Sequence, residues 1–146
     1  MNLMTPPPNA AVFLQHVVQN NVDVVKQALS SQPELLHAKT TDNFRYTALH
    51  RASQLGHVEM VKVLLENGAN IHEVSQRMSW KALLLAAKHG HTKVVELLLN
   101  AGDDVNVQLA YSKNRFTSLH FACQYGHIDL ARMLITKYKA RLDITS

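Results

Sequence analysis

The chain has 146 residues, 47% of them hydrophobic, and fifteen Lys and Arg against eleven Asp and Glu give it a net charge of +4. This composition is typical of a globular domain and excludes a disordered chain. No apolar run approaches the ~20 residues of a membrane-spanning helix, and the first residues lack the basic start of a secretory signal. The mild positive charge lacks the dense Lys and Arg clusters that are usual in nucleic-acid-binding proteins.

The first part of the chain predicts a lead-in followed by two short helices. Residues 1–9 contain three consecutive prolines, Pro6 to Pro8, which predict an extended segment. From Ala10 to Leu29 the apolar residues recur at helical spacing, with a turn expected at Asn20-Asn21. A short turn should follow at Pro33.

A pattern that begins at Thr47 returns twice downstream. Residues 47–59 read TALHRASQLGHVE, residues 81–93 read KALLLAAKHGHTK, and residues 117–129 read TSLHFACQYGHID. The steps of 34 and 36 residues between the Gly-His pairs indicate a repeat array. In the repeat at 47–80, Thr47 should cap a helix near 48–55, and a second helix should run near 58–66. All five glycines have places in the repeat pattern, so none remains for a phosphate-binding loop.

These residues resemble the ankyrin repeat. Its family pattern is matched by Thr-Ala-Leu-His at 47–50, the Gly-His pairs, and the Val- and Leu-rich run at 94–99. The resemblance covers residues 10–146 and implies an all-α solenoid of antiparallel helix pairs with projecting β-hairpin-like fingers. The repeats would run over residues 10–46, 47–80, 81–116 and 117–146. The implied function is non-catalytic binding of another protein.

Two departures from the family pattern are informative. Lys81 and Leu84 stand where the family has threonine and histidine, a hydrogen-bonded pair, so their joint replacement avoids a buried group without a partner. The second helix of the last repeat is too apolar to cap the stack well. We therefore expect this repeat to fray first, and we expect the chain to be a fragment of a longer protein.

The sequence predicts no catalytic residue, no cofactor and no metal site. Five of the nine histidines have places in the repeat pattern, and His89-Gly90-His91 lacks the i, i+4 spacing of a zinc pair. Cys123, the only cysteine, occupies a position where the family usually has alanine, so we expect a small buried residue. A single cysteine excludes an intramolecular disulfide, which fits the cytoplasm, the nucleus or a host-cell cytosol.

The finger tips hold the first set of candidate binding residues. An aromatic residue directly precedes each later repeat, and a basic residue lies one to three positions before it. Since equivalent positions of a solenoid line up, these residues should form two parallel stripes. Tyr, Trp and Arg are enriched at binding hot spots, although packing between fingers alone would also explain the aromatic residues. The residues of this set are Arg45, Tyr46, Arg77, Trp80, Arg115 and Phe116.

A second set of candidates lies at the end of the first helix of each later repeat, which faces the concave groove in the family. The six residues are Gln54, Leu55, Lys88, His89, Gln124 and Tyr125. Leu55 and Tyr125 would be unusual on a purely solvated face, although single exposed apolar residues are common. We expect both sets to contact a partner.

The favoured function is recognition of an extended or loop segment that carries acidic and apolar residues, by a monomeric module without a membrane partner. One alternative is a targeting or substrate-recruitment arm of a larger enzyme, such as a secreted bacterial effector. Another is a small stand-alone ankyrin inhibitor of a kinase. Nucleic-acid binding through the basic finger tips ranks last, and it would predict affinity that falls steeply with salt.

Overall fold

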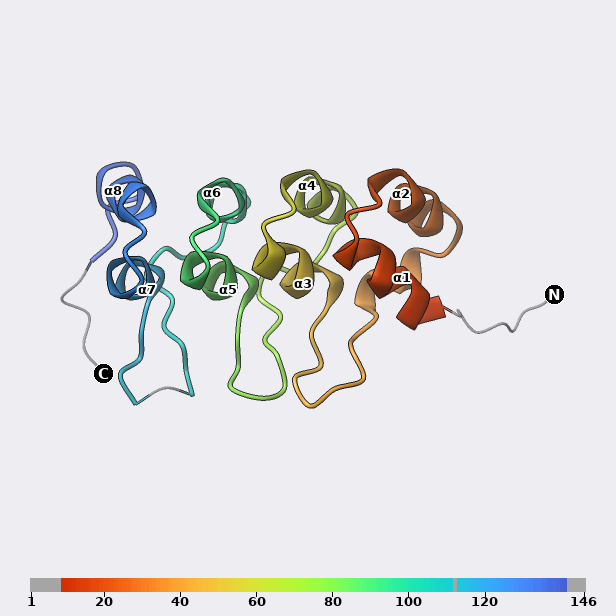
Figure 1. The fold of residues 1–146 in the computed structure, drawn as a ribbon, viewed down its shortest axis with the longest axis horizontal. Helices are drawn as coiled ribbons and strands as arrows, with labels where there is room; N and C mark the ends of the chain where they lie inside the picture. Colours follow the sequence, from red (N-terminus) through yellow and green to blue (C-terminus); the bar gives the residue numbers. More distant parts are fainter. Residues whose placement is uncertain (1–8, 112, 142–146) are drawn as a thin grey trace.

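A computed structural model describes residues 9–111 and 113–141 of the chain. The helices in this part of the chain form two layers, with α1, α3, α5 and α7 in one layer and α2, α4, α6 and α8 in the other (Figure 1). Three finger loops project from the first layer, on the side away from the second. The helices are α1 (Asn9–Val18), α2 (Val22–Ser31), α3 (Ala48–Leu55), α4 (Val58–Glu66), α5 (Ala82–Lys88), α6 (Thr92–Asn100), α7 (Ser118–Gln124) and α8 (Ile128–Thr136), with a 3-10 turn η1 (Pro33–His37) after α2.

The helix limits agree with the prediction. The pair α3 and α4 spans the expected residues, and the side-chain oxygen of Thr47 accepts the backbone N–H of His50 as a helix cap. One limit differs, because α1 already begins at Asn9, whereas the sequence predicts that the extended lead-in includes this residue. The rest of that segment, residues 1–8, lies outside the described residues. The all-α solenoid architecture is therefore confirmed.

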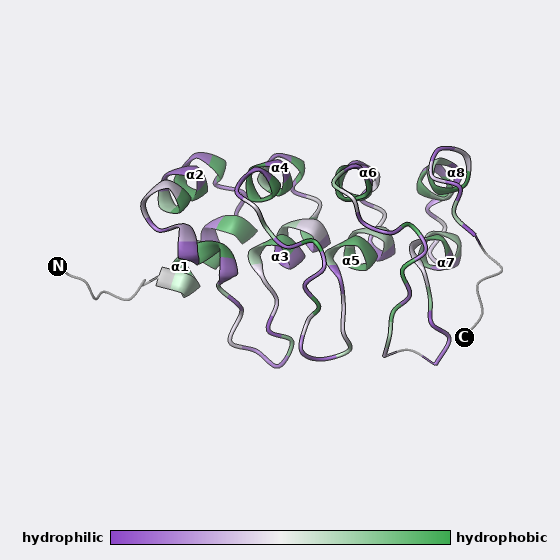
Figure 2. Ribbon diagram, turned by 180° about the vertical axis from the view of Figure 1, so that it is seen from behind, coloured by the Kyte–Doolittle hydropathy of each residue, from purple (hydrophilic) through white to green (hydrophobic). Residues whose placement is uncertain are grey.

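The core runs along the solenoid between the two layers. Its largest fully buried side chains come from both layers and include Met60, Leu64, Leu83, Leu98 and Leu134. Each helix carries apolar and polar residues, as the alternating colours in Figure 2 show. Burying one such side chain stabilises the fold by about 1.5 to 3 kcal/mol. No helix among the described residues is long and apolar enough to cross a membrane.

The Gly-His pairs clamp each repeat onto the one before it. Nε2 of His57, His91 and His127 donates to the carbonyl oxygen of Val18, Gln54 and Lys88 respectively, at 2.9 Å in each case. A Cβ added to Gly56 would lie 2.5 Å from Nδ1 of His91, and one added to Gly90 would lie 2.6 Å from Nδ1 of His127. The glycine therefore has two purposes, because it adopts a positive φ and leaves room for the next imidazole.

The fingers are β-hairpin-like, as expected. A backbone N–H on the outgoing arm donates to the carbonyl oxygen of the aromatic residue on the returning arm, from Thr40 to Tyr46 at 2.8 Å and from Ser75 to Trp80 at 2.8 Å. The third finger has the same bond from Leu109 to Phe116, at 2.7 Å. The N–H of Gln76 also donates to the carbonyl of Phe44, which ties the first two fingers together.

Cys123 is exposed, and the expectation that it is buried is wrong. The repeat steps make it equivalent to Ser53 and Ala87, both of which are fully buried. Those two positions are covered because α3 packs against α5, and α5 against α7. Cys123 lies in α7, the last inner-layer helix that the structure describes. Its exposure thus depends on its place in the array and not on its residue type.

Candidate protein-binding groove

A groove lies where the inner helices meet the first two fingers. The C-terminal ends of α3 and α5 supply its polar rim, and the fingers supply an aromatic wall. The open space between them is about 420 Å³. We call this space the central groove; it is lined by Asp42, Phe44, Tyr46, Gln54, Met78, Trp80, Leu85, Lys88 and His89.

The finger aromatics turn inward and pack, as the packing alternative predicts, and their contact with a partner stays a prediction. Tyr46 and Trp80 are each only 7% exposed, and Phe116 is half-buried. Tyr46 stacks on Phe44 with ring centroids 5.2 Å apart, and Trp80 lies 5.5 Å from Phe121. The ring contacts of Tyr46 with Phe44 and of Trp80 with Phe121 account for this burial. The rings therefore pack, while parts of Tyr46 and Trp80 still line the central groove.

His50 holds the backbone of Trp80 in place. Nδ1 of His50 accepts the N–H of Thr47 at 3.0 Å, so the ring proton must sit on Nε2. Nε2 then donates to the carbonyl oxygens of Glu73 and Trp80, both at 3.0 Å. Burial lowers the pKa of His50 below its usual range, although these carbonyls act in the opposite direction. A neutral, buried imidazole thus positions the aromatic wall.

The arginines of the fingers do not form a regular stripe. Arg45 and Arg115 are exposed and occupy equivalent positions, with φ of 55° and 49° directly before the aromatic residue. In the second finger the residue at that position is Ser79, with φ of 53°. Arg77 lies two residues earlier, where its carbonyl accepts the hydroxyl of Ser75 at 2.7 Å. The expectation of three aligned arginines is therefore wrong for Arg77.

The helix ends supply the rim of the groove. Gln54 and Lys88 are half-buried, and their carbonyls are the ones held by His91 and His127, which fixes the backbone of the rim. Nζ of Lys88 lies 5.2 Å from the centre of the Trp80 ring, a cation–π contact. The pKa of His89 is lowered, mainly by burial of its ring and further by the charges of Lys88, His91 and His127.

The central groove thus brings together five of the twelve predicted binding residues, namely Tyr46, Gln54, Trp80, Lys88 and His89. Leu55 and Tyr125 lie outside this lining but are 38% and 48% exposed. The others outside it are Arg45, Arg77, Arg115, Phe116 and Gln124.

Sequence reasoning missed four residues of the lining. Phe44 and Met78 each lie two positions before a groove aromatic, and this shared register could have identified them. Leu85 is a buried helix residue. Asp42 Oδ1 accepts hydrogen bonds from the Thr40 hydroxyl and from the N–H groups of Phe44 and Arg45. Burial alone would raise the pKa of Asp42, but these bonds outweigh it and lower the pKa, which favours the carboxylate.

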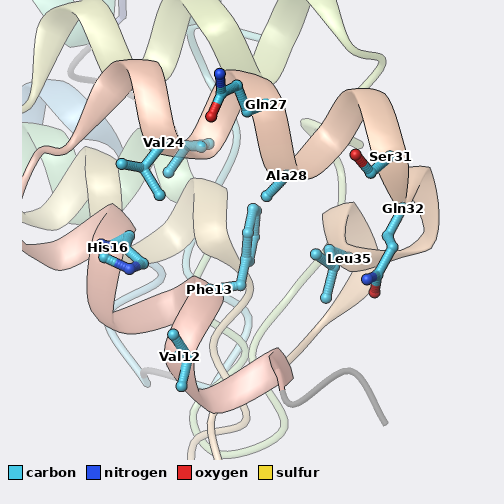
Figure 3. A pocket seen from close by; sticks show the side chains of 10 residues that line it. Val12, Phe13, His16, Val24, Gln27, Ala28, Ser31, Gln32 and Leu35 are labelled. Atoms are coloured by element: carbon cyan, nitrogen blue, oxygen red, sulfur yellow. The ribbon is translucent and has the colours of Figure 1, made fainter. Parts of the chain in front are cut away.

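Another hollow, of about 370 Å³, lies at the N-terminal end of the solenoid between α1, α2 and η1 (Figure 3). The side chains of Phe13 and Leu35 line it, together with Val12 and Val24, which are 49% and 43% exposed. Its lining contains no charged residue. It offers apolar contact but lacks the convergent charged groups that orient a ligand.

Comparison with known proteins agrees with this geometry. A family model described as ankyrin repeats in three copies matches residues 5–76 and 72–146. Protein phosphatase 1 regulatory subunit 27 of Homo sapiens is 30% identical over 129 residues, which are 88% of this chain and 58% of that protein. XBAT31 of Arabidopsis thaliana, whose name assigns it provisionally to the E3 ubiquitin-protein ligases, is also 30% identical over 129 residues, which are 88% of this chain and 27% of that protein. The serine/threonine-protein kinase VIK of Arabidopsis thaliana is 37% identical over 76 residues, 52% of this chain and 16% of that protein. The chain thus spans about a quarter of the length of XBAT31 and less of VIK.

Proposed function

The chain belongs to the ankyrin-repeat family, whose repeats are protein-interaction modules and are generally non-catalytic, and we propose that residues 10–146 form such a module. The module would hold an extended or loop segment of one partner protein between the inner helices and the fingers. In this proposal the four repeats have the limits expected from the sequence, and the module acts as a monomer inside the cell, where a single exposed thiol is kept reduced.

The observation that carries the proposal is the central groove, which joins an aromatic wall to a polar rim that carries Lys88. Interfaces are anchored by a few aromatic and arginine residues, while charge complementarity sets orientation and the rate of encounter. The three finger tips carry Arg45, Arg77, Lys113 and Arg115, against one carboxylate, Asp42. This balance favours a partner segment with acidic and apolar residues.

The experiment is quantitative capture from cell lysate with two matched triple variants. The groove variant replaces two side chains that line the central groove and one exposed residue next to them with serine, as Gln54→Ser, His89→Ser and Leu55→Ser. The control variant replaces three exposed residues of the outer layer with serine, as Lys62→Ser, Ile128→Ser and Ile135→Ser. Circular dichroism must first establish that both variants fold.

We expect the native chain and the outer-layer variant to capture the same partner and the groove variant to lose it. If the outer-layer variant loses the partner while the groove variant keeps it, the binding surface is on the other side of the solenoid. If both variants keep it, neither set of residues takes part in binding, and the groove assignment is wrong.

A second candidate is that the module recruits a substrate for an enzyme carried by the same polypeptide. The supporting observation is that VIK is named as a kinase and matches this chain over a minor part of its length. The apparent mass of the endogenous protein on an immunoblot separates the two functions. A mass near 16.4 kDa would favour the module alone, and a much larger mass would favour the recruitment arm.

A further inference from the structure

The central groove has two chemically different halves, and their arrangement specifies the kind of segment that fits. This inference rests on the proposed function. We propose that Lys88 pairs with an Asp or Glu side chain of the bound segment, while the adjoining aromatic hollow takes one bulky apolar side chain from the same segment. The groove would therefore recognise a short motif in which an acidic residue lies close to a large apolar one.

The apolar half is built before any partner arrives. Phe44 and Tyr46 stack with an interplanar angle of 7°, and the second finger adds Met78 and Trp80. The hydrogen bond from Gln76 to the carbonyl of Phe44 fixes one finger against the other. Since these side chains are already held by packing, a guest side chain loses entropy on binding but the wall does not.

The acidic preference comes from Lys88. Within the described part of the chain, its Nζ has no carboxylate within ion-pair distance; the acidic side chains in ion pairs there are paired with other cations. The cation–π contact with Trp80 keeps Nζ beside the aromatic wall. A carboxylate bound at Nζ would thus come from a residue near the one that fills the hollow.

Asp42 sets the direction of the segment. It comes from the first finger, whereas Lys88 ends α5, so within the groove lining the carboxylate lies on the finger side and the ammonium on the helix side. Three hydrogen bonds to Oδ1 stabilise the charged form of Asp42. A second carboxylate near it would be repelled, so the acidic end of the segment should face Lys88.

A protein segment fits this groove better than a nucleic acid. Binding of single strands depends on bases that stack on open aromatic faces. Here Tyr46 faces Phe44, Trp80 contacts both Phe121 and Lys88, and both residues are largely buried. Tyr46 and Trp80 therefore offer little open ring face to a base.

The test titrates isotope-labelled chain with three synthetic peptides and follows backbone amide shifts by NMR. The first peptide places Asp-Glu before Phe in a Gly-Ser frame, the second has Lys-Lys in place of Asp-Glu, and the third has Gly in place of Phe. We expect the first peptide to shift the amides of Gln54, Leu85 and Lys88, and the other two to bind about tenfold more weakly. Lys88→Glu should reverse the preference between the first two peptides, whereas Lys93→Glu, on the exposed face of α6, should not.

Equal shifts from the acidic and the basic peptide would overturn the proposal, as would shifts confined to residues outside the groove. Displacement of the acidic peptide by a thymidine dodecamer, with loss of affinity in salt, would point to nucleic acid instead. The proposed function is tested separately, because the capture variants leave Lys88 and the aromatic wall unchanged. If capture depends on the groove but the peptides are not discriminated, the module binds protein and only this motif is wrong.

Discussion

Lys81 and Asp103 form a buried ion pair, with Nζ and Oδ1 2.6 Å apart and side chains only 10% and 0% exposed. The pair explains why the repeat at 81–116 lacks the threonine and histidine found at 47–50. Asp103 stands where Ala69 lies in the preceding repeat, so a third change accompanies Lys81 and Leu84. Leu84 is fully buried, and Asp103 Oδ1 also accepts the N–H of Asp104 at 2.8 Å. A buried ion pair has thus replaced the hydrogen-bonded threonine and histidine of the two neighbouring repeats.

Removing one partner of this pair should be strongly destabilising. Asp103→Ala leaves the Lys81 ammonium buried without its carboxylate, and we expect the free energy of unfolding to fall by about 3 to 5 kcal/mol. The triple variant Lys81→Thr, Leu84→His and Asp103→Ala installs the threonine–histidine pair and should recover most of the loss. Urea denaturation measures both variants. A loss below about 0.5 kcal/mol for Asp103→Ala, the size of an ordinary surface substitution, would mean that the pair contributes nothing.

His50 should make stability depend on pH. Its pKa is lowered in the fold, so the unfolded chain binds the proton more readily. The contribution is therefore fully present above the unfolded pKa of about 6.5 and is lost as pH falls from there toward the folded value. We expect the difference in unfolding free energy between pH 7.5 and pH 5.5 to be smaller in His50→Gln, which cannot titrate but keeps a capping side chain. The other histidines are common to both proteins, so equal differences would contradict the assignment.

We expect Arg45 to lower the free energy of unfolding through its backbone strain while its side chain favours binding of the partner. Its φ of 55° is unfavourable for a residue with a Cβ, and glycine relieves that strain. We expect Arg45→Gly to raise the free energy of unfolding by about 0.5 to 1 kcal/mol and to weaken partner capture. Arg77→Gly is the matched control, because Arg77 is not among the described residues with positive φ. Equal changes in melting temperature for the two variants would contradict this prediction.

The glycines of the Gly-His pairs should differ in their tolerance of alanine. At Gly126 nothing lies within 4 Å of an added Cβ, so alanine adds only the strain of φ 75°, about 1 to 2 kcal/mol. At Gly90 the added Cβ also meets the ring of His127, which must move and give up its bond to Lys88. We expect Gly90→Ala to lose about 1 to 3 kcal/mol more than Gly126→Ala. Urea denaturation of the two variants measures the difference, provided that their m-values are equal. Equal urea midpoints would contradict the prediction.

The repeat formed by α7 and α8 should open first. Ile128 and Ile135 are 67% and 46% exposed, whereas Leu99, equivalent to Ile135, is buried. With fewer buried apolar contacts, local opening there needs less free energy. Amide hydrogen exchange should be fastest in α8 and slower in α4 and α6. Uniform protection across the four helix pairs would contradict the expectation.

Local rules account for the part of the fold that sequence alone could predict. Thr47 caps the helix three residues before His50, and Gly56 adopts a left-handed conformation that needs no distant partner. Such features act within one turn of helix, so their period of 34 to 36 residues was enough to place the helices and to identify the repeat.

The direction of side chains could not be read from the chain in the same way. Tyr46 and Trp80 are aromatic residues at finger ends, but whether they project or pack depends on Phe44 and Phe121, which reach them from other parts of the solenoid. The spacing of Arg77 predicts a place in the row of finger arginines, whereas the turn formed by Ser75 gives the second finger a different register.

The sequence by itself determined the helix pairs, their glycine ends and the repeat period, because each follows from contacts between near neighbours in the chain. Only the tertiary structure decided the burial of Tyr46 and Trp80, the exposure of Cys123 and the pairing of Lys81 with Asp103. These depend on which repeat covers which, and the same residue type is buried in the middle of a stack and exposed where no described repeat packs against it.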